Sequence, residues 1–257
     1  MDKEQILYED HDIIVCYKPA GIATQTAKIG QLDMVSEVIK YLSTSKENET
    51  EAANKISGRR STKVAPYVGL VHRLDQPVEG LLVFGKNQKA SGILSRQITE
   101  NRMEKYYYAV VNAGKLSRQQ DTKREGTLID YLFKDGKTNT SCIAAKEKEG
   151  AKRAELFYKV LKQISIEETE ETEAALVEIK LVTGRHHQIR VQMSHAGMSL
   201  FGDYKYADEQ TRKASDLLQQ KQVALCAYKL CFDHPMTGKR LVFQKVPAGH
   251  VFQKFFE

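Results

Sequence analysis

One short segment constrains this chain more than any other: residues 81–84 are consecutive apolar residues that directly follow a polar loop. An uninterrupted apolar run of this length predicts a buried strand. The loop before it carries His72, Arg73 and Asp75 and is broken by a proline and a glycine. A loop that leads into a buried strand can hold a reactive side chain in one geometry. The segment is therefore a candidate site, although an ordinary turn with a surface ion pair would contain the same residue types.

Composition indicates a globular protein, since 41% of the 257 residues are hydrophobic and 28% are charged. Lys and Arg exceed Asp and Glu by 39 to 33, a formal net charge of +6 that suits a polyanionic partner without proving one. The four cysteines form no Cys-x-x-Cys pair, which disfavours a zinc ribbon and favours reduced thiols. Neither a leader peptide nor a long apolar run is visible, so we expect a cytoplasmic protein that does not enter a membrane.

Apolar periodicity predicts more strands than helices. The predicted strands are 6–8, 13–17, 81–84, 106–111, 128–133, 141–145, 154–166, 176–181, 223–232 and 240–246. The predicted helices are 31–42, 88–100, 187–197 and 206–219. Several neighbouring strands are joined by short turns, which favours an α+β protein with a mixed, largely antiparallel central sheet flanked by helices and loops.

Residues 43–64 are polar and charged and contain almost no large apolar side chain, so we expect a mobile surface loop there. Its basic end lies just before the candidate site, and either a solvated loop or an arm that contacts a nucleic acid fits this composition. No Pro/Gly-rich linker divides the chain, so residues 1–257 are expected to form a single catalytic domain. No Gly-rich phosphate loop is present, so we expect no nucleotide cofactor.

Two later segments extend the pattern of the candidate site. Residues 105–111 read Lys-Tyr-Tyr-Tyr-Ala-Val-Val, and residues 181–191 read Leu-Val-Thr-Gly-Arg-His-His-Gln-Ile-Arg-Val. Together with the preceding His-Arg-Leu-Asp, and in this order, they resemble the motifs of the RluA-type pseudouridine synthases. Shorter matches are Lys-Pro-Ala-Gly at 18–21, Gly-Asp-Tyr at 202–204 and Asp-His-Pro-Met-Thr-Gly at 233–238.

The resemblance covers residues 6–247 and implies the pseudouridine synthase fold. About five residues precede the first predicted strand, so we expect a form of the family without its N-terminal S4-like RNA-binding module. The implied function is that of an isomerase that converts specific uridines of structured rRNA or tRNA to pseudouridine. This reaction breaks the C1′–N1 bond and joins C1′ to C5 of the same base. Because no atoms are gained, we expect no cofactor, and we expect a monomer.

The resemblance assigns the nucleophile to Asp75. A carboxylate is ionised at neutral pH and can form a covalent adduct. Whether it attacks C1′, adds to the base or assists loss of the 2′ proton is left open by the sequence. The resemblance gives Arg190 as its partner, and we expect the guanidinium to grip both carboxylate oxygens. Arg185 is the alternative partner and is otherwise expected to contact an RNA phosphate or to position the turn.

The family places an aromatic ring against the uracil, which here is Tyr107, with a phenol that could act as acid or base. On a strand, Tyr107 shares a face with Ala109, opposite to its two neighbouring tyrosines. The target base must leave the helical stack to be reached. The resemblance implies that Arg73 helps to hold the RNA during this step. The full set of expected RNA-binding residues is Arg73, His72, Lys105, Arg185 and His187.

Three points remain open. His186, His187 and His195 raise the possibility of zinc, but no carboxylate completes a recognised spacing, so we expect no metal. Val78-Glu79-Gly80 stands where the family commonly has Thr-Ser-Gly, which puts local RNA contact and target choice in doubt. Two other functions are a basic RNA-binding protein that keeps the fold without chemistry and a metal hydrolase built on the histidines. The joint presence of a nucleophile, a tyrosine and an arginine speaks against the first.

Overall fold

The computed structural model describes residues 1–26, 30–44, 65–114, 124–166 and 172–256. Almost all of the predicted polar loop 43–64 therefore lies outside the described residues. The strands are β1 (Ile6–Glu9), β2 (Ile13–Lys18), β3 (Gly69–Leu70), β4 (Glu79–Gly85), β5 (Glu104–Asn112), β6 (Glu125–Asp135), β7 (Thr140–Ile143), β8 (Lys152–Ser165), β9 (Glu173–Leu181), β10 (Leu225–Asp233) and β11 (Arg240–Gln244). The helices are η1 (Lys3–Gln5), α2 (Gln88–Thr99), α4 (Gln188–His195), α5 (Glu209–Leu217) and α6 (His250–Phe256), together with helical residues 34–44.

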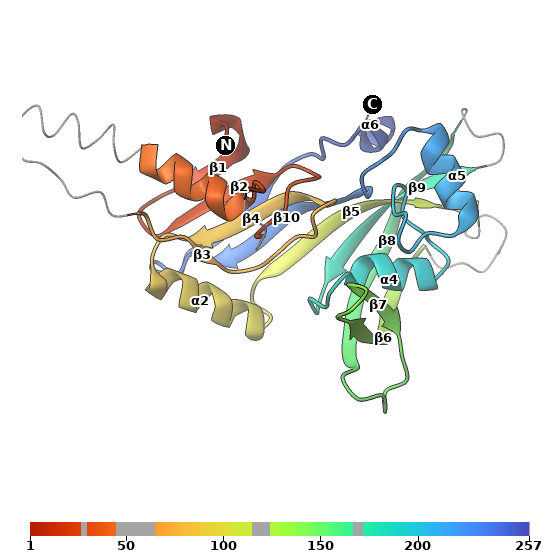
Figure 1. Ribbon diagram of the computed structural model, residues 1–257, viewed down its shortest axis with the longest axis horizontal. Coiled ribbons are helices and arrows are strands. Elements are labelled where there is room, and N and C mark those ends of the chain that lie inside the picture. The colour runs from red at the N-terminus through yellow and green to blue at the C-terminus, as the bar shows by residue number, and fades with distance from the viewer. Residues whose placement is uncertain (27–29, 45–64, 115–123, 167–171, 257) are drawn as a thin grey trace, which may run out of the picture.

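One sheet runs through the molecule in the order β1-β2-β4-β10-β5-β9-β8-β6-β7, with β11 beside β10 and β3 beside β4 (Figure 1). The strand pairs are antiparallel except β4 with β10, which are parallel. This confirms the expected α+β class and the mixed, largely antiparallel sheet. Gly80 makes the parallel pair possible: its φ is +134°, and a Cβ there would lie 2.4 Å from the Ala227 nitrogen.

A hydrophobic core lies on each face of the central part of the sheet. One face packs against helical residues 34–44 and α4, and its core includes Ile14, Phe84, Val177, Met34 and Met193. The opposite face packs against α2, α5 and α6, and its core includes Ile13, Val83, Leu94, Ala214 and Phe252. Adjacent residues of β2 thus enter different cores, as the alternation of a strand requires. Within the described residues, no helix has both the length and the apolar content needed to cross a bilayer.

Two helices begin later than predicted, because a side chain caps each start. Asp33 Oδ1 accepts a hydrogen bond from the Ser36 amide, and helical residues run from 34 rather than from 31. Asp208 accepts one from the Thr211 amide, and α5 runs from Glu209 rather than from 206. Residues 203–207 are consequently free to form a loop. The sequence did not predict β3 or α6.

Glu79 lies in the interior, with 5% of its surface exposed. Its carboxylate accepts hydrogen bonds from the Tyr17 hydroxyl at 2.6 Å and from the amides of Ala248 and Gly249 at 3.2 and 3.0 Å. It therefore ties β4 to the segment that leads into α6. Val78 is also buried, in the opposite core. Neither side chain is therefore placed to contact a substrate directly.

Candidate active site

The loop that carries Asp75 is held on both sides by the end of β2 and the segment that follows it. Thr24 Oγ1 accepts a hydrogen bond from the Leu74 amide at 3.0 Å and donates one to the Leu74 carbonyl at 2.8 Å. On the other side, the Gln76 carbonyl accepts hydrogen bonds from Lys18 Nζ at 3.1 Å and from a backbone amide at 2.8 Å. The backbone is therefore held at the residue before and at the residue after the predicted nucleophile.

Lys18 belongs to the Lys-Pro-Ala-Gly match and is fully buried. Its ammonium also donates to the carbonyls of Pro19 at 3.0 Å and Ile22 at 2.6 Å, so three backbone carbonyls share its protons. Burial lowers the pKa of Lys18 to about 8, although the negative charge of Asp75 opposes this. The match at 18–21 thus has a structural role that the sequence did not indicate: it positions the loop of the nucleophile.

Arg190, on α4, is the buried cation of the site, with 5% of its surface exposed. Its Nη1 donates to Asp75 Oδ2 at 3.4 Å. Its Nε and Nη2 donate to the two oxygens of Asp203 at 2.7 and 2.6 Å. The expectation that the guanidinium grips both oxygens of Asp75 is therefore wrong, because Asp203 takes the two-pronged contact. Burial disfavours the charge, but the bonds to Asp203 raise the pKa of Arg190, so it stays a cation.

His187 also contacts the predicted nucleophile, with Nε2 3.6 Å from Asp75 Oδ2. Its Nδ1 lies 2.6 Å from the Tyr206 hydroxyl, which accepts a hydrogen bond from the Ser141 amide at 2.9 Å. The Asp75 carboxylate is an acceptor, so it favours the imidazole proton on Nε2, and Nδ1 then accepts the proton of the Tyr206 hydroxyl. Burial lowers the pKa of His187 to about 4, although Asp75 opposes this. At neutral pH the ring is neutral and presents an N–H to Asp75.

Tyr107, on β5, is 5% exposed and packs in the same core as Ala109, while Tyr106 and Tyr108 pack on the opposite side. This confirms the face that strand alternation predicted. Burial raises the pKa of Tyr107, and the nearby charge of Asp75 raises it further. The phenol therefore keeps its proton at neutral pH, which suits a proton donor better than a base.

The fold brings Asp75, Tyr107, His187 and Arg190 together, but not Arg185. Arg185 is exposed, and its Nε donates to the Arg153 carbonyl at 2.9 Å, which fastens the turn before α4 to β8. Arg73 is exposed on the loop of the nucleophile.

Sequence reasoning missed the roles of Asp203 and Tyr206. The Gly-Asp-Tyr match at 202–204 contains Asp203 but did not indicate its role. Tyr206 fell inside a predicted helix, and only the later start of α5 leaves it in a loop beside the site. Nothing in its local sequence distinguished it from a helical residue. The Ser141 that completes its hydrogen bonds lies on β7, in a hairpin that projects beside α4 (Figure 1).

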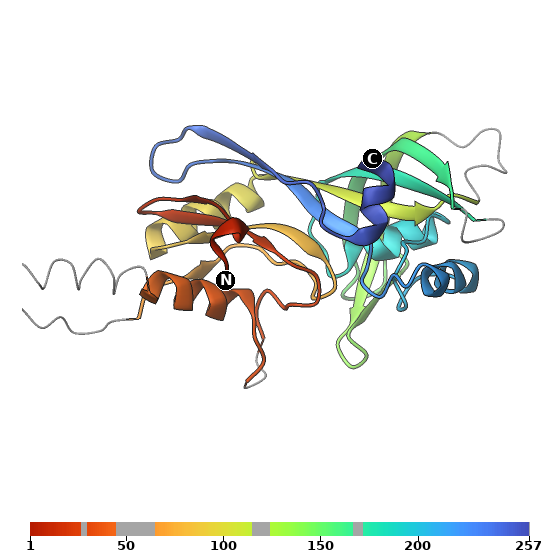
Figure 2. The ribbon, with the colours of Figure 1, turned by 90° about the horizontal axis from the view of Figure 1, so that it is seen from above.

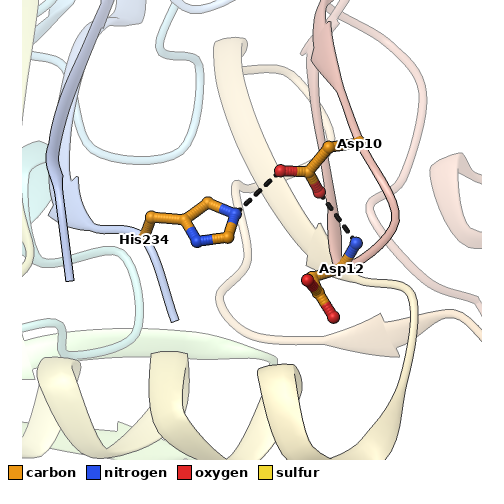
Figure 3. Close-up of side chains that lie close together, drawn as sticks. All are labelled: Asp10, Asp12 and His234. Atoms are coloured by element: carbon orange, nitrogen blue, oxygen red, sulfur yellow. Dashed lines mark hydrogen bonds and ion pairs between the residues drawn. The ribbon is translucent and has the colours of Figure 1, made fainter. Parts of the chain in front are cut away.

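A second cluster, formed by Asp10, Asp12 and His234, has side chains of the types that bind metals (Figure 3). It joins the β1–β2 turn to the β10–β11 hairpin, which extends over that end of the molecule (Figure 2). His234 Nδ1 accepts hydrogen bonds from the amides of residues 236 and 237, so its proton lies on Nε2 and is donated to Asp10 Oδ2 at 2.7 Å. Asp10 Oδ1 accepts hydrogen bonds from the backbone amides of residues 12 and 13. These atoms serve as a structural brace between the first and last hairpins.

Comparison with known proteins identifies the class. The chain is 30% identical to ribosomal large subunit pseudouridine synthase D of Zymomonas mobilis, covering 93% of this chain and 68% of the relative. It is 26% identical to tRNA pseudouridine synthase C of Yersinia pestis, covering 92% and 84%. The solved structure of human RNA pseudouridylate synthase domain containing 4 shares the fold, with a TM-score of 0.67, 21% identity and coverage of 98% and 92%.

The fold and these relatives define an isomerase that acts on RNA. Residues 12–195 match the family described as RNA pseudouridylate synthase, and the chain belongs to that family.

Proposed function

We propose that this protein isomerises specific uridines of rRNA or tRNA and that Asp75 is the nucleophile. One observation carries the assignment: the side chain of Asp75 is 29% exposed, yet it is held against the buried Arg190 on a doubly clamped loop. The family relationship supports the reaction. The relatives from Zymomonas and Yersinia are named for ribosomal RNA and for tRNA, so their names support both classes of substrate.

The geometry supports different roles for the groups around Asp75. The contacts from Arg190 and His187 both go to Oδ2, which leaves Oδ1 to meet the substrate. Arg190 places a positive charge against the carboxylate, and Tyr107 lies beneath the uracil as a protonated phenol. In the reaction the C1′–N1 bond breaks, the base turns, and a C5–C1′ bond forms. The proton lost from C5 is matched by the proton gained at N1, so no external reductant or oxidant is required.

The exposed arginines fit contacts to the RNA outside the pocket. Arg73 lies two residues from Asp75, where it can hold the strand from which the uridine has been flipped. Arg185 lies at the turn before α4, where its guanidinium can reach a phosphate. We propose further that the chain is a single catalytic domain, supported by its one continuous sheet, and that it works as a monomer in the cytoplasm, where rRNA and tRNA are found.

Pseudouridine mapping of total RNA tests the function. RNA from cells with and without the protein is compared, and the protein or its Asp75→Asn variant is then restored. We expect one or more uridines to lose modification without the protein and to regain it only with the unaltered chain. A non-catalytic RNA-binding protein predicts an unchanged map, and that result would overturn the proposal.

A further inference from the structure

His72, three residues before Asp75, has a buried ring nitrogen that lacks an acceptor. Its Nε2 accepts a hydrogen bond from the Val83 amide at 3.4 Å, so the proton of the neutral ring lies on Nδ1. Nδ1 is buried, and nothing in the described part of the chain accepts its proton. Burial lowers the pKa of His72 to about 3, so the ring is neutral at working pH. Buried donors are normally satisfied, so this one is a candidate to bind an acceptor from outside the described residues.

Lys105 is a second donor of this kind. It lies two residues before Tyr107 on β5, and so on the same face of the sheet. Burial lowers its pKa, and across the described ranges no carboxylate or other acceptor contacts its Nζ. His72 bonds the Val83 amide on β4, and Lys105 lies opposite Leu230 of β10, the strand between β4 and β5. The two side chains therefore come from the same part of the sheet, and the charge of Lys105 also lowers the pKa of His72. A Cβ at the exposed Gly184 would lie 3.7 Å from Nζ, which places the ammonium at the surface beside the turn that leads into α4.

We propose that Lys105 Nζ and the His72 Nδ1–H group bind one phosphate of the RNA next to the target uridine. This inference rests on the proposed function, because it adds a ligand group to the same site. A half-buried cation is stabilised by a counter-charge, which favours a phosphate over a neutral carbonyl of the base. A phosphate has several oxygens, so it can accept from both donors at once.

The position of the subsite gives it a purpose. His72 lies on the loop of Asp75, and Lys105 lies on the strand of Tyr107, so a phosphate held between them would fix the strand relative to both. Contacts to phosphates set the register of a nucleic acid and carry no sequence information. The subsite would therefore place the sugar of any target uridine against Asp75, whichever RNA is used.

The first test is the salt dependence of RNA binding. The probe is an RNA stem-loop that carries a mapped uridine, bound by Asp75→Asn protein so that it is not turned over, between 50 and 200 mM salt. Lys105→Met should reduce the magnitude of the slope of log K against log salt concentration by about 0.7 to 0.9, the value for one lost phosphate contact. Lys180→Met is the matched control, because Lys180 is an adjacent-strand lysine on the opposite face that already pairs with Glu104 at 2.6 Å.

The second test alters the RNA. Each phosphate next to the uridine is replaced singly by a neutral methylphosphonate. With native Lys105, methylphosphonate at one of these positions should weaken binding about tenfold, as expected for a lost charge-assisted bond. With Lys105→Met, the natural and the substituted RNA should bind equally well. His72→Gln keeps an acceptor for the Val83 amide, so it should fold normally. It loses the Nδ1 donor, so it should reduce the difference in affinity between the natural and the substituted RNA.

The results separate two failures. If Lys105→Met changes the salt slope no more than Lys180→Met does, or if it weakens binding without any coupling to a methylphosphonate, the phosphate subsite is wrong. Binding is measured apart from turnover, so neither result bears on the isomerase. An unchanged pseudouridine map contradicts the proposed function instead.

Discussion

Arg190 binds Asp203 through two short hydrogen bonds and Asp75 through a single longer one. The two carboxylates thus bind the same guanidinium, and Asp203, which is only 1% exposed, makes the more numerous and shorter hydrogen bonds to it. An Asp203 oxygen also accepts the amides of residues 205 and 206, so its orientation is set by the loop as well as by the arginine. Asp203 therefore positions Arg190. The other oxygen of Asp75, Oδ1, has no side-chain contact among the described residues.

Replacing Asp203 should reveal this positioning role. Asp203→Asn removes the charge that Arg190 faces in the interior, and breaking a buried pair in this way costs about 3 to 5 kcal/mol of unfolding free energy. We expect kcat to fall more than KM rises, because the arginine is free to turn toward Asp75. Urea unfolding and steady-state kinetics measure the two effects. Asp233→Asn is the control, since its pair with Arg240 is exposed and worth less than about 1 kcal/mol. Normal kcat in Asp203→Asn would contradict the role.

The nucleophile is tested by Asp75→Asn. An amide has nearly the shape of the carboxylate but cannot form the covalent adduct. We expect pseudouridine formation by the purified variant to be abolished, with RNA affinity changed by no more than a few-fold. Near-normal turnover would show that the assignment is wrong.

Arg190→Lys and Arg185→Lys distinguish the two arginines of the third motif. Lysine keeps the charge but loses the planar fork, so it cannot hold Asp203 and Asp75 at the same time. Arg190→Lys should therefore damage turnover more than affinity. Arg185→Lys should leave turnover largely intact and change affinity slightly, because Arg185 bonds a backbone carbonyl outside the pocket. The reverse pattern in kinetics and binding would mean that the roles are exchanged.

Tyr206→Phe should change the tautomer of His187. Without the hydroxyl, no other described residue donates to Nδ1, and the proton is no longer confined to Nε2. Nitrogen NMR of the ring should show the Nε2–H form in the unaltered protein and a mixture in the variant, with a several-fold loss of kcat. Tyr204→Phe is the control, since its hydroxyl bonds Asp216 at the surface. An unchanged tautomer would exclude this role for Tyr206.

His72 and His187 should make folding stability depend on pH. Burial lowers the pKa of His72 to about 3 and that of His187 to about 4, whereas a histidine of the unfolded chain titrates near ~6.5. Below ~6.5 the unfolded chain binds protons that the folded chain does not, so stability falls as pH falls. Between ~6.5 and ~4 the slope should be about 1 kcal/mol per pH unit for each ring, allowing for solvent screening.

Urea unfolding at several pH values in this window measures that slope. His72→Gln should flatten it, while His11→Gln, which alters a side chain that is 93% exposed, should leave it as it is. A slope unaffected by His72→Gln would mean that His72 is not held neutral by the fold.

The sequence by itself determined the strands other than β3, the loop of the nucleophile and the face on which Tyr107 lies. These features depend on local periodicity, since successive side chains of a strand point to opposite faces wherever the strand is placed. It also determined that Asp75 and Arg190 belong to one site, because the order and content of the motifs resemble one family.

Only the tertiary structure decided which groups complete the site. Both Asp75 and Asp203 can pair with Arg190, and the choice depends on how the 203–207 loop packs against α4. Tyr206 enters the site because Asp208 delays the start of α5, and Glu79 is buried because the segment before α6 supplies two amides. Hydrogen-bond partners are selected from polar groups that long-range packing brings together, and spacing along the chain does not encode that selection.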